Sequence, residues 1–350
     1  MLKNPTVVGL GARLIGVGLA VLFVALILLA SGAPPFEAIG LMVTGALGST
    51  RKIIDVISTA VPLLLATAGL LITFAAGLWN IGIEGQITAG AIFTVGALRL
   101  FVDTDVPPGL AILIGSVAGM IGGALWASLA GLLKIYGGVN EIFSGLGLNF
   151  VATSATIWLI FGPWRRPGVG SMSGTEPLPP EFALPEMEGL RISAWAIILA
   201  LVGIAVVFVL LRGTYIGLKL KSTGHNPRAS YVLGIPTSRY TLLAFVLCGM
   251  LAGLAGAVQV TAVYNRLIPS ISSGYGFLGL LVAMLINYQV LWAIPVALFY
   301  AALIVGSIQL PIQLRLDSSL AGVMQGALVL FVLIIDGVRQ RLRERLRERT

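Results

Sequence analysis

The stretch from Gly77 to Gly90, GLWNIGIEGQITAG, places amide and carboxyl side chains inside a chain that is otherwise strongly apolar. Asn80, Glu84 and Gln86 offer hydrogen-bond donors and acceptors, and polar or ionisable groups within a bilayer usually face a cavity or a partner. The glycines around them indicate an interrupted helix, which is tolerated at membrane depth only where it is buried in protein or lines an aqueous path. These residues predict either a path for a hydrophilic solute or polar bridges between helices.

Other polar residues lie in or at the ends of apolar segments. Each can form hydrogen bonds between helices or with a polar solute. They are Asn149, Gln259, Asn287 and Gln289. Glu141 follows Asn140, a good N-cap residue, and a carboxylate in the first turn of a helix is favoured by the helix dipole. A helix start near the cytoplasmic interface therefore accounts for Glu141 without a transport role.

The side chains that catalysis or metal binding requires are scarce. Cys248 is the only cysteine, and His225, the only histidine, has no acidic residue near it in sequence. A nucleophile elbow is absent, and the string GYGFLG at 274–279 follows no strand, as a dinucleotide fingerprint must. GLKLKST at 217–223 lacks the glycine that precedes the lysine of a phosphate-binding loop. We therefore expect no catalytic residue, no metal site and no bound ATP in this chain.

The composition predicts a membrane protein. Of 350 residues, 57% are hydrophobic and 10% are charged, whereas charged residues make up about a quarter of a soluble domain. The apolar runs do not alternate as the strands of a membrane barrel do, so the predicted fold is all-α. The net charge of +8 does not indicate nucleic-acid binding, because most basic residues flank apolar segments.

A membrane span needs about 20 apolar residues. On this basis the chain is predicted to form a single transmembrane domain, residues 1–350, with about ten helices. These are 13–31, 53–76, 84–101, 109–133, 141–162, 192–212, 239–262, 271–287, 290–311 and 319–337. Glycines spaced four apart predict close packing between helices. They are Gly115, Gly119 and Gly123, then Gly249 and Gly253, and finally Gly322 and Gly326.

The charges predict that both termini are cytoplasmic, because basic residues concentrate on that side of a membrane. Residues 163–191 then form an external Pro-rich loop, which is either a connector or a docking surface. Residues 338–350 form a basic cytoplasmic tail suited to lying on anionic lipid headgroups.

The cytoplasmic loop 213–238 contains the signals of a short helix of about two turns. Asn226 is a good N-cap, Pro227 suits the first helical position, and Gly234 can end the helix in a left-handed conformation. Such a helix suits the groove of a partner protein. A structured turn at the membrane surface is the alternative.

Three stretches carry a resemblance to a known family: GLWNIGIEGQ at 77–86, GGVNEIFSGLGLNF at 137–150 and GHNPRASYVLGI at 224–235. The chain resembles the permease subunits of ABC importers for nucleosides, within a group that also handles ribose-type sugars and branched-chain amino acids. The resemblance covers nearly the whole chain and implies a type II-like ABC importer permease in the inner membrane of a prokaryote. It implies four partners: a second permease, two cytoplasmic ATPases that bind ATP and Mg²⁺, and an external substrate-binding lipoprotein.

The resemblance also implies residue roles. The coupling helix that enters the ATPase would include Gly224, His225, Asn226, Pro227, Arg228, Ala229, Tyr231 and Gly234. The substrate pathway would be bordered by Trp79, Asn80, Glu84, Gln86 and Asn149, with Trp79 stacking on a base or anchoring in the membrane.

Three points remain open at the level of sequence. GLLVAMLINYQV at 279–290 departs from the family's usual pattern, which leaves Asn287 and Gln289 without a family role. An ABC permease for a simple sugar such as ribose is one alternative function. A stand-alone, ion-coupled transporter in which Glu84 exchanges a proton is another.

Overall fold

All of the regular secondary structure that the structure describes is helical. The computed structural model describes residues 34–168, 173–190, 192–286 and 289–315 continuously, with scattered positions within 18–32 and 322–337. Every regular element in these ranges is a helix. Six are long and apolar enough to cross a membrane: Thr50–Ala75, Pro108–Ile135, Glu141–Phe161, Ala194–Gly213, Thr237–Tyr264 and Val290–Leu314.

The predicted spans agree with these six to within a few residues. The first and last predicted spans, 13–31 and 319–337, lie largely outside the described residues. The spans predicted at 84–101 and 271–287 correspond to shorter helices of 17 and 11 residues. Helix α2 (Pro35–Leu47), which starts with a proline at its first position, was not predicted.

The chain divides into two compact units, Met1–Val56 with Phe299–Thr350, and Ile57–Leu298. In the first unit, α2 contacts α13 (Gln309–Leu314). Met42 and Leu310 belong to its apolar cluster. Gly45 permits this close approach, because a Cβ there would lie 2.7 Å from Cγ of Gln309.

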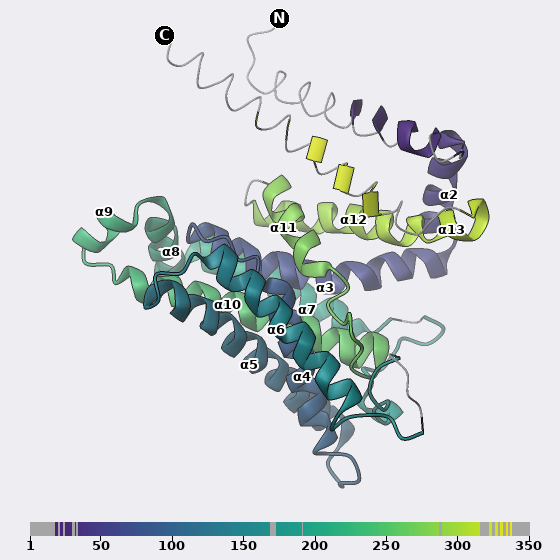
Figure 1. The fold of residues 1–350 in the computed structure, drawn as a ribbon, viewed down its shortest axis with the longest axis horizontal. Coiled ribbons are helices and arrows are strands. Elements are labelled where there is room, and N and C mark those ends of the chain that lie inside the picture. The colour runs from purple at the N-terminus through teal and green to yellow at the C-terminus, as the bar shows by residue number, and fades with distance from the viewer. Residues whose placement is uncertain are drawn as a thin grey trace, which may run out of the picture. The chain divides into compact units, whose positions relative to one another are not determined.

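The second unit carries the residues of functional interest. The boundaries between the units along the sequence fall within α3 (Thr50–Ala75) and α12 (Ala293–Ser307). The remaining α-helices of the second unit are α4 (Ile83–Arg99), α5 (Pro108–Ile135), α6 (Glu141–Phe161), α7 (Ala194–Gly213), α8 (Tyr215–His225), α9 (Pro227–Val232), α10 (Thr237–Val258) and α11 (Tyr275–Leu285). Helices α4, α5 and α10 pack against one another, with α5 along one edge of this unit (Figure 1).

Glycines allow α4, α5 and α10 to approach closely. A Cβ at Gly123 of α5 would lie 2.7 Å from the Cα of Gly253 in α10, and a Cβ at Gly90 of α4 would lie 2.8 Å from the Gly253 carbonyl carbon. Real Cβ atoms do not come so near to backbone, so these positions exclude any side chain. The predicted packing at Gly119, Gly123, Gly249 and Gly253 is confirmed. By contrast, a Cβ at Gly322 or Gly326 would meet no described atom within 4 Å.

The predicted span 239–262 ends in an irregular way. Helix α10 passes into a π-helical turn, η2 (Gln259–Tyr264), and Asn265 ends it with a left-handed φ of 50°. π-Helical turns are rare in proteins, and those that occur are often found at functional sites. Gln259 donates hydrogen bonds from Nε2 to the Ile271 carbonyl, at 3.3 Å, and to Ser273 Oγ, at 3.4 Å.

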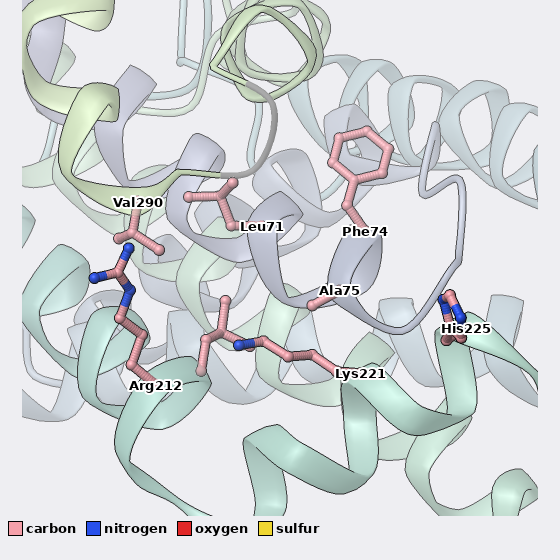
Figure 2. A pocket seen from close by; sticks show the side chains of 9 residues that line it. Leu71, Phe74, Ala75, Arg212, Lys221, His225 and Val290 are labelled. Carbon is pink, nitrogen blue, oxygen red and sulfur yellow. The ribbon is translucent and has the colours of Figure 1, made fainter. Parts of the chain in front are cut away.

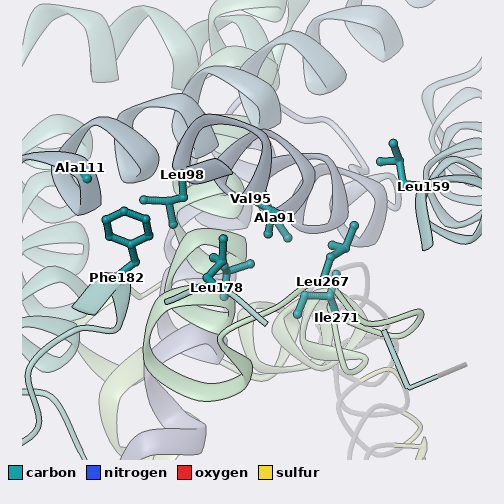
Figure 3. Packing of buried hydrophobic residues seen from close by; sticks show 10 residues of the cluster. Ala91, Val95, Leu98, Ala111, Leu159, Leu178, Phe182, Leu267 and Ile271 are labelled. Carbon is teal, nitrogen blue, oxygen red and sulfur yellow. The ribbon is translucent and has the colours of Figure 1, made fainter. Parts of the chain in front are cut away.

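The described part of the loop that was predicted to be external packs against the helices. The backbone N–H groups of Thr175, Leu178 and Leu184 donate hydrogen bonds to carbonyls of Leu267, Asn265 and Thr261, at 2.8–2.9 Å. Leu178 and Phe182 are buried in an apolar cluster that also contains Leu98 and Leu267 (Figure 3). The loop is therefore fastened over the ends of α4 and η2.

Candidate functional site

The polar stretch found in the sequence lies where the chain breaks between α3 and α4. Helix α3 ends at Ala75, and Gly77 follows with a φ of 71°, in the left-handed region that favours glycine. The Leu78 N–H donates to the Thr73 carbonyl at 2.9 Å. The chain then runs without helical structure until α4 begins at Ile83. The predicted interruption is confirmed.

Two buried amides close this break. Asn80 Nδ2 donates to Gln86 Oε1 at 3.0 Å, and Gln86 Nε2 donates to Asn80 Oδ1 at 2.9 Å. Asn80 Nδ2 also lies 3.1 Å from Cys248 Sγ of α10. Because buried polar groups are costly unless paired, this reciprocal amide pair stabilises the bend between the break and the first turn of α4.

Asn149 of α6 completes the start of α4 from outside that helix. The residue before α4, Gly82, has no side chain to act as a cap. Asn149 Oδ1 accepts a hydrogen bond from the Gly85 N–H at 2.8 Å, while its Nδ2 donates to the Ile81 carbonyl at 3.0 Å. A first-turn N–H group, which no helix can satisfy internally, is thus capped by a neighbouring helix.

Glu84 has a similar role toward α11. Its carboxylate accepts a hydrogen bond from the Phe277 N–H at 3.0 Å, in the first turn of α11. The residue before that helix, Gly274, also has no side chain to act as a cap. A Cβ at Gly276 would lie 3.2 Å from the carboxyl carbon of Glu84, so glycine permits this approach. The carboxylate is well placed here, because negative charge is stabilised at helix amino termini.

The other predicted residues near the break lie at its edge. Trp79 is 41% exposed, and its ring meets Phe74 edge-on with 5.5 Å between ring centroids. Glu141 begins α6 after the N-cap Asn140, whose side chain accepts from the Ile142 N–H at 2.9 Å, so the predicted cap is confirmed. Glu141 also pairs with Lys134 of α5, with 2.6 Å between Nζ and Oε2.

The predicted cytoplasmic helix is present as α9. Asn226 is its N-cap, accepting a hydrogen bond from the Ala229 N–H at 3.0 Å, and Pro227 is its first residue. Gly234 has a φ of 82°, and the Ile235 N–H bonds back to the Ser230 carbonyl at 3.0 Å. The predicted start and left-handed stop are both confirmed. The sequence did not predict α8, which precedes it and is capped by Thr214.

Helix α9 exposes apolar side chains. Tyr231 is 70% exposed, Val232 83% and Leu233 79%. Among the predicted coupling residues, His225, Arg228 and Ala229 are also exposed, whereas Gly224 is partly buried. An exposed apolar cluster on a short, well-capped helix is typical of a surface that binds another protein.

A direct backbone contact joins α8 to the break after α3. A Cβ at Gly77 would lie 2.9 Å from both the Cα and the carbonyl oxygen of Gly224. A Cβ at Gly224 would lie 2.6 Å from the Gly77 nitrogen and 2.7 Å from the Ala76 carbonyl carbon. We call this contact the Gly77–Gly224 joint. It was not predicted, because nothing local relates two glycines so far apart in sequence.

Most of the chain matches a known protein family. Residues 52–333 match the family model described as the branched-chain amino acid transport system / permease component. The chain belongs to this family.

Curated relatives of this permease cover most of its length. It is 27% identical over 316 residues to the glucose ABC transporter permease protein TsgB13 of Haloferax volcanii, which covers 87% of this chain and 82% of that relative. It is 28% identical over 304 residues to the nucleoside ABC transporter permease protein NupB of Lactococcus lactis, with 85% and 82% covered. The guanosine ABC transporter permease protein NupP of Bacillus subtilis is 24% identical, with 88% of both chains covered.

These relatives are all named as permease proteins of ABC transporters. The protein is therefore an ABC transporter permease, a transport component rather than an enzyme, and it is a multi-pass membrane protein.

Proposed function

We propose that this permease is the transmembrane subunit of an ATP-driven importer whose substrates are nucleosides. It would act with a second permease, two cytoplasmic ATPases that bind ATP and Mg²⁺, and an external substrate-binding lipoprotein. Both termini and α9 would face the cytoplasm of a prokaryote, across its inner membrane. The observation that carries the proposal is the Gly77–Gly224 joint, because it connects the exposed α9 region to the polar break at the start of α4.

The coupling step is assigned to α8 and α9. We infer that the ATPase receives Tyr231, Val232 and Leu233 in an apolar groove, with Arg228 beside them. The predicted coupling residues Gly224 to Gly234 span the end of α8, the N-cap of α9 and its left-handed stop. A segment with such defined ends moves as a unit. Movement imposed on it reaches the break through backbone contact, which has no side-chain freedom to absorb it.

The substrate pathway is proposed to pass beside the break. Asn80, Gln86 and Asn149 pair with each other or with backbone in this conformation, and Glu84 caps α11. A change in the helix contacts would release some of these donors and acceptors for substrate hydroxyls and a base edge. Trp79, the most exposed of the predicted pathway residues, would then stack on a base or anchor the segment in the membrane.

The choice of nucleosides rests on relatives named for nucleoside and guanosine transport, and on the resemblance of GLWNIGIEGQ. A simple sugar is the second candidate, because a relative named for glucose transport has similar identity over similar length. The cognate external lipoprotein decides between them. Its binding of a panel of nucleosides and sugars, measured by calorimetry, should show affinity for nucleosides alone. Binding of sugars alone would replace the nucleoside assignment without changing the ATP-driven mechanism.

Reconstituted vesicles test the mechanism itself. Uptake should require the ATPases, ATP and the lipoprotein, and it should not respond to a proton or sodium gradient. An ion-coupled transporter would behave in the opposite way, with uptake driven by the gradient in the absence of the ATPases.

A further inference from the structure

The described residues form a pocket of about 360 Å³ at the end of α3. Four elements supply its walls: the end of α3, the end of α7, α8, and the short helix η3 (Val290–Trp292). Its lining includes Leu71, Phe74, Leu211, Arg212, Lys221 and His225. This volume is in the range of pockets that hold small ligands.

The pocket is basic on one side and apolar on the other. In Figure 2, Arg212 and Lys221 rise from α7 and α8, and Leu71 and Phe74 of α3 lie across from them. The Lys221 side chain extends along the pocket toward the end of α7. None of the described residues that line it carries a carboxylate.

The two cations have no ionic partner in the part of the chain that the structure describes. The one ion pair found there joins Lys134 to Glu141. Arg212 lies over the Phe208 ring, with its guanidinium carbon 5.1 Å from the ring centroid, which orients it without neutralising it. Two like charges that share one pocket repel each other, so an anion between them is favoured. Arginine and lysine are the usual ligands of phosphate groups.

The position of the pocket identifies the kind of anion. Arg212 is the next-to-last residue of α7, and Phe74 and Ala75 end α3; both helices are long and apolar enough to span a membrane. The pocket thus lies at the level where spans end and lipid headgroups begin. A soluble phosphate would need the cations alone, whereas a phospholipid would also cover Leu71, Leu211 and Val290 with its glycerol and first acyl carbons.

We propose that this pocket binds the headgroup of an anionic phospholipid, with Arg212 and Lys221 holding its phosphate. In the orientation proposed above, on which this inference rests, the lipid belongs to the cytoplasmic leaflet. The pocket also contains Gly224, so a bound lipid lies directly against the Gly77–Gly224 joint. It therefore fastens the ends of α3 and α7 to α8, and lipid composition regulates how well movement of α9 reaches the break.

Lipid binding to the purified complex of permeases and ATPases tests this site without any transport measurement. The complex is delipidated and titrated with phosphatidylglycerol, phosphatidylcholine or glycerol 3-phosphate, and bound ligand is counted by native mass spectrometry. Phosphatidylglycerol should be retained in preference to the other two. Arg212→Gln and Lys221→Gln should each weaken its retention about fivefold, the effect of one basic residue at a lipid surface.

Lys219→Gln is the matched control. Lys219 lies on the same helix two residues from Lys221, but its ammonium is over the Tyr240 ring, at 5.5 Å, and not in the pocket. It should retain phosphatidylglycerol as the native chain does. Equal retention of phosphatidylcholine and phosphatidylglycerol by the native chain would overturn the proposal. This comparison uses the native chain alone, so it does not depend on whether any variant folds.

Two further outcomes would also overturn it. Equally tight binding of glycerol 3-phosphate would mean that the ligand is a soluble phosphate. If Lys221→Gln released the ATPase and left lipid retention unchanged, a partner protein would occupy the pocket. Because these readouts do not involve uptake, their failure is distinguishable from failure of the importer assignment.

Discussion

The Gly77–Gly224 joint should respond sharply to a single added methyl group. In Gly224→Ala the new Cβ would lie 2.6 Å from the Gly77 nitrogen, about 1 Å inside ordinary contact with backbone that cannot rotate away. Overpacking of this kind costs about 1–3 kcal/mol. In the proposed mechanism the two sides of this contact move together. A cost of that size that differs between the two transport conformations would change their ratio about 5–150-fold.

The assay is the ratio of substrate taken up to ATP hydrolysed, in vesicles that contain the complete transporter. We expect Gly224→Ala to lower this ratio at least fivefold, while α9 still binds the ATPase and hydrolysis continues. Gly109→Ala is the control, since a Cβ at Gly109 meets nothing within 4 Å. For Gly77→Ala, which adds a left-handed φ to the clash, the control is Gly138→Ala, with a φ of 63° and open space around it. If Gly224→Ala and Gly109→Ala gave the same ratio, backbone contact would not transmit the movement.

Substitutions at three other positions separate effects on stability from effects on transport. Glu84→Ala removes the acceptor of the Phe277 N–H and should lower the free energy of unfolding by about 1–3 kcal/mol. Glu84→Gln should keep most of that stability and still impair uptake. Full uptake by Glu84→Gln would show that the carboxylate has no role in the pathway. Asn149→Ala should lower the midpoint temperature of thermal unfolding more than Asn149→Asp, because aspartate keeps the acceptor for the Gly85 N–H. Equal midpoint temperatures for the two variants would show that this cap does not stabilise the fold. Tyr231→Ala should change the permease's free energy of unfolding by no more than about 0.5 kcal/mol, because the side chain is exposed. The same substitution should weaken ATPase association in a pull-down assay. Unchanged association would refute the docking of α9 on the ATPase.

Local signals in the sequence were sufficient for parts of this fold. The ends of α9 follow from Asn226, Pro227 and Gly234, because caps and left-handed stops depend on a few adjacent residues. The break after α3 was predictable because glycines and amides within an apolar run conflict with a continuous helix. Helix α2 was missed because its 13 residues are too few for a span and begin beside two prolines.

The contacts of the site were less predictable than its residues. The polar residues of the break were identified, but whether each met another protein group or a solute was open. The structure pairs Asn80 with Gln86 and Cys248, and it places Glu84 against α11. Such pairings depend on which helices are neighbours, and a single sequence contains no signal for that. The same reason explains why the Gly77–Gly224 joint was not predicted. Pathway and coupling roles remain predictions for the experiments above.

The capping of α4 and α11 by other helices has a consequence for biogenesis. The Gly85 N–H finds its acceptor 64 residues further along the chain, and Glu84 finds its donor 193 residues further along. Until those later segments have left the ribosome and entered the bilayer, α4 would expose unpaired polar groups to lipid. The nascent chain must therefore keep this helix at the insertion machinery or in contact with water, and it can take its final place only when nearly all of the second unit has been synthesised.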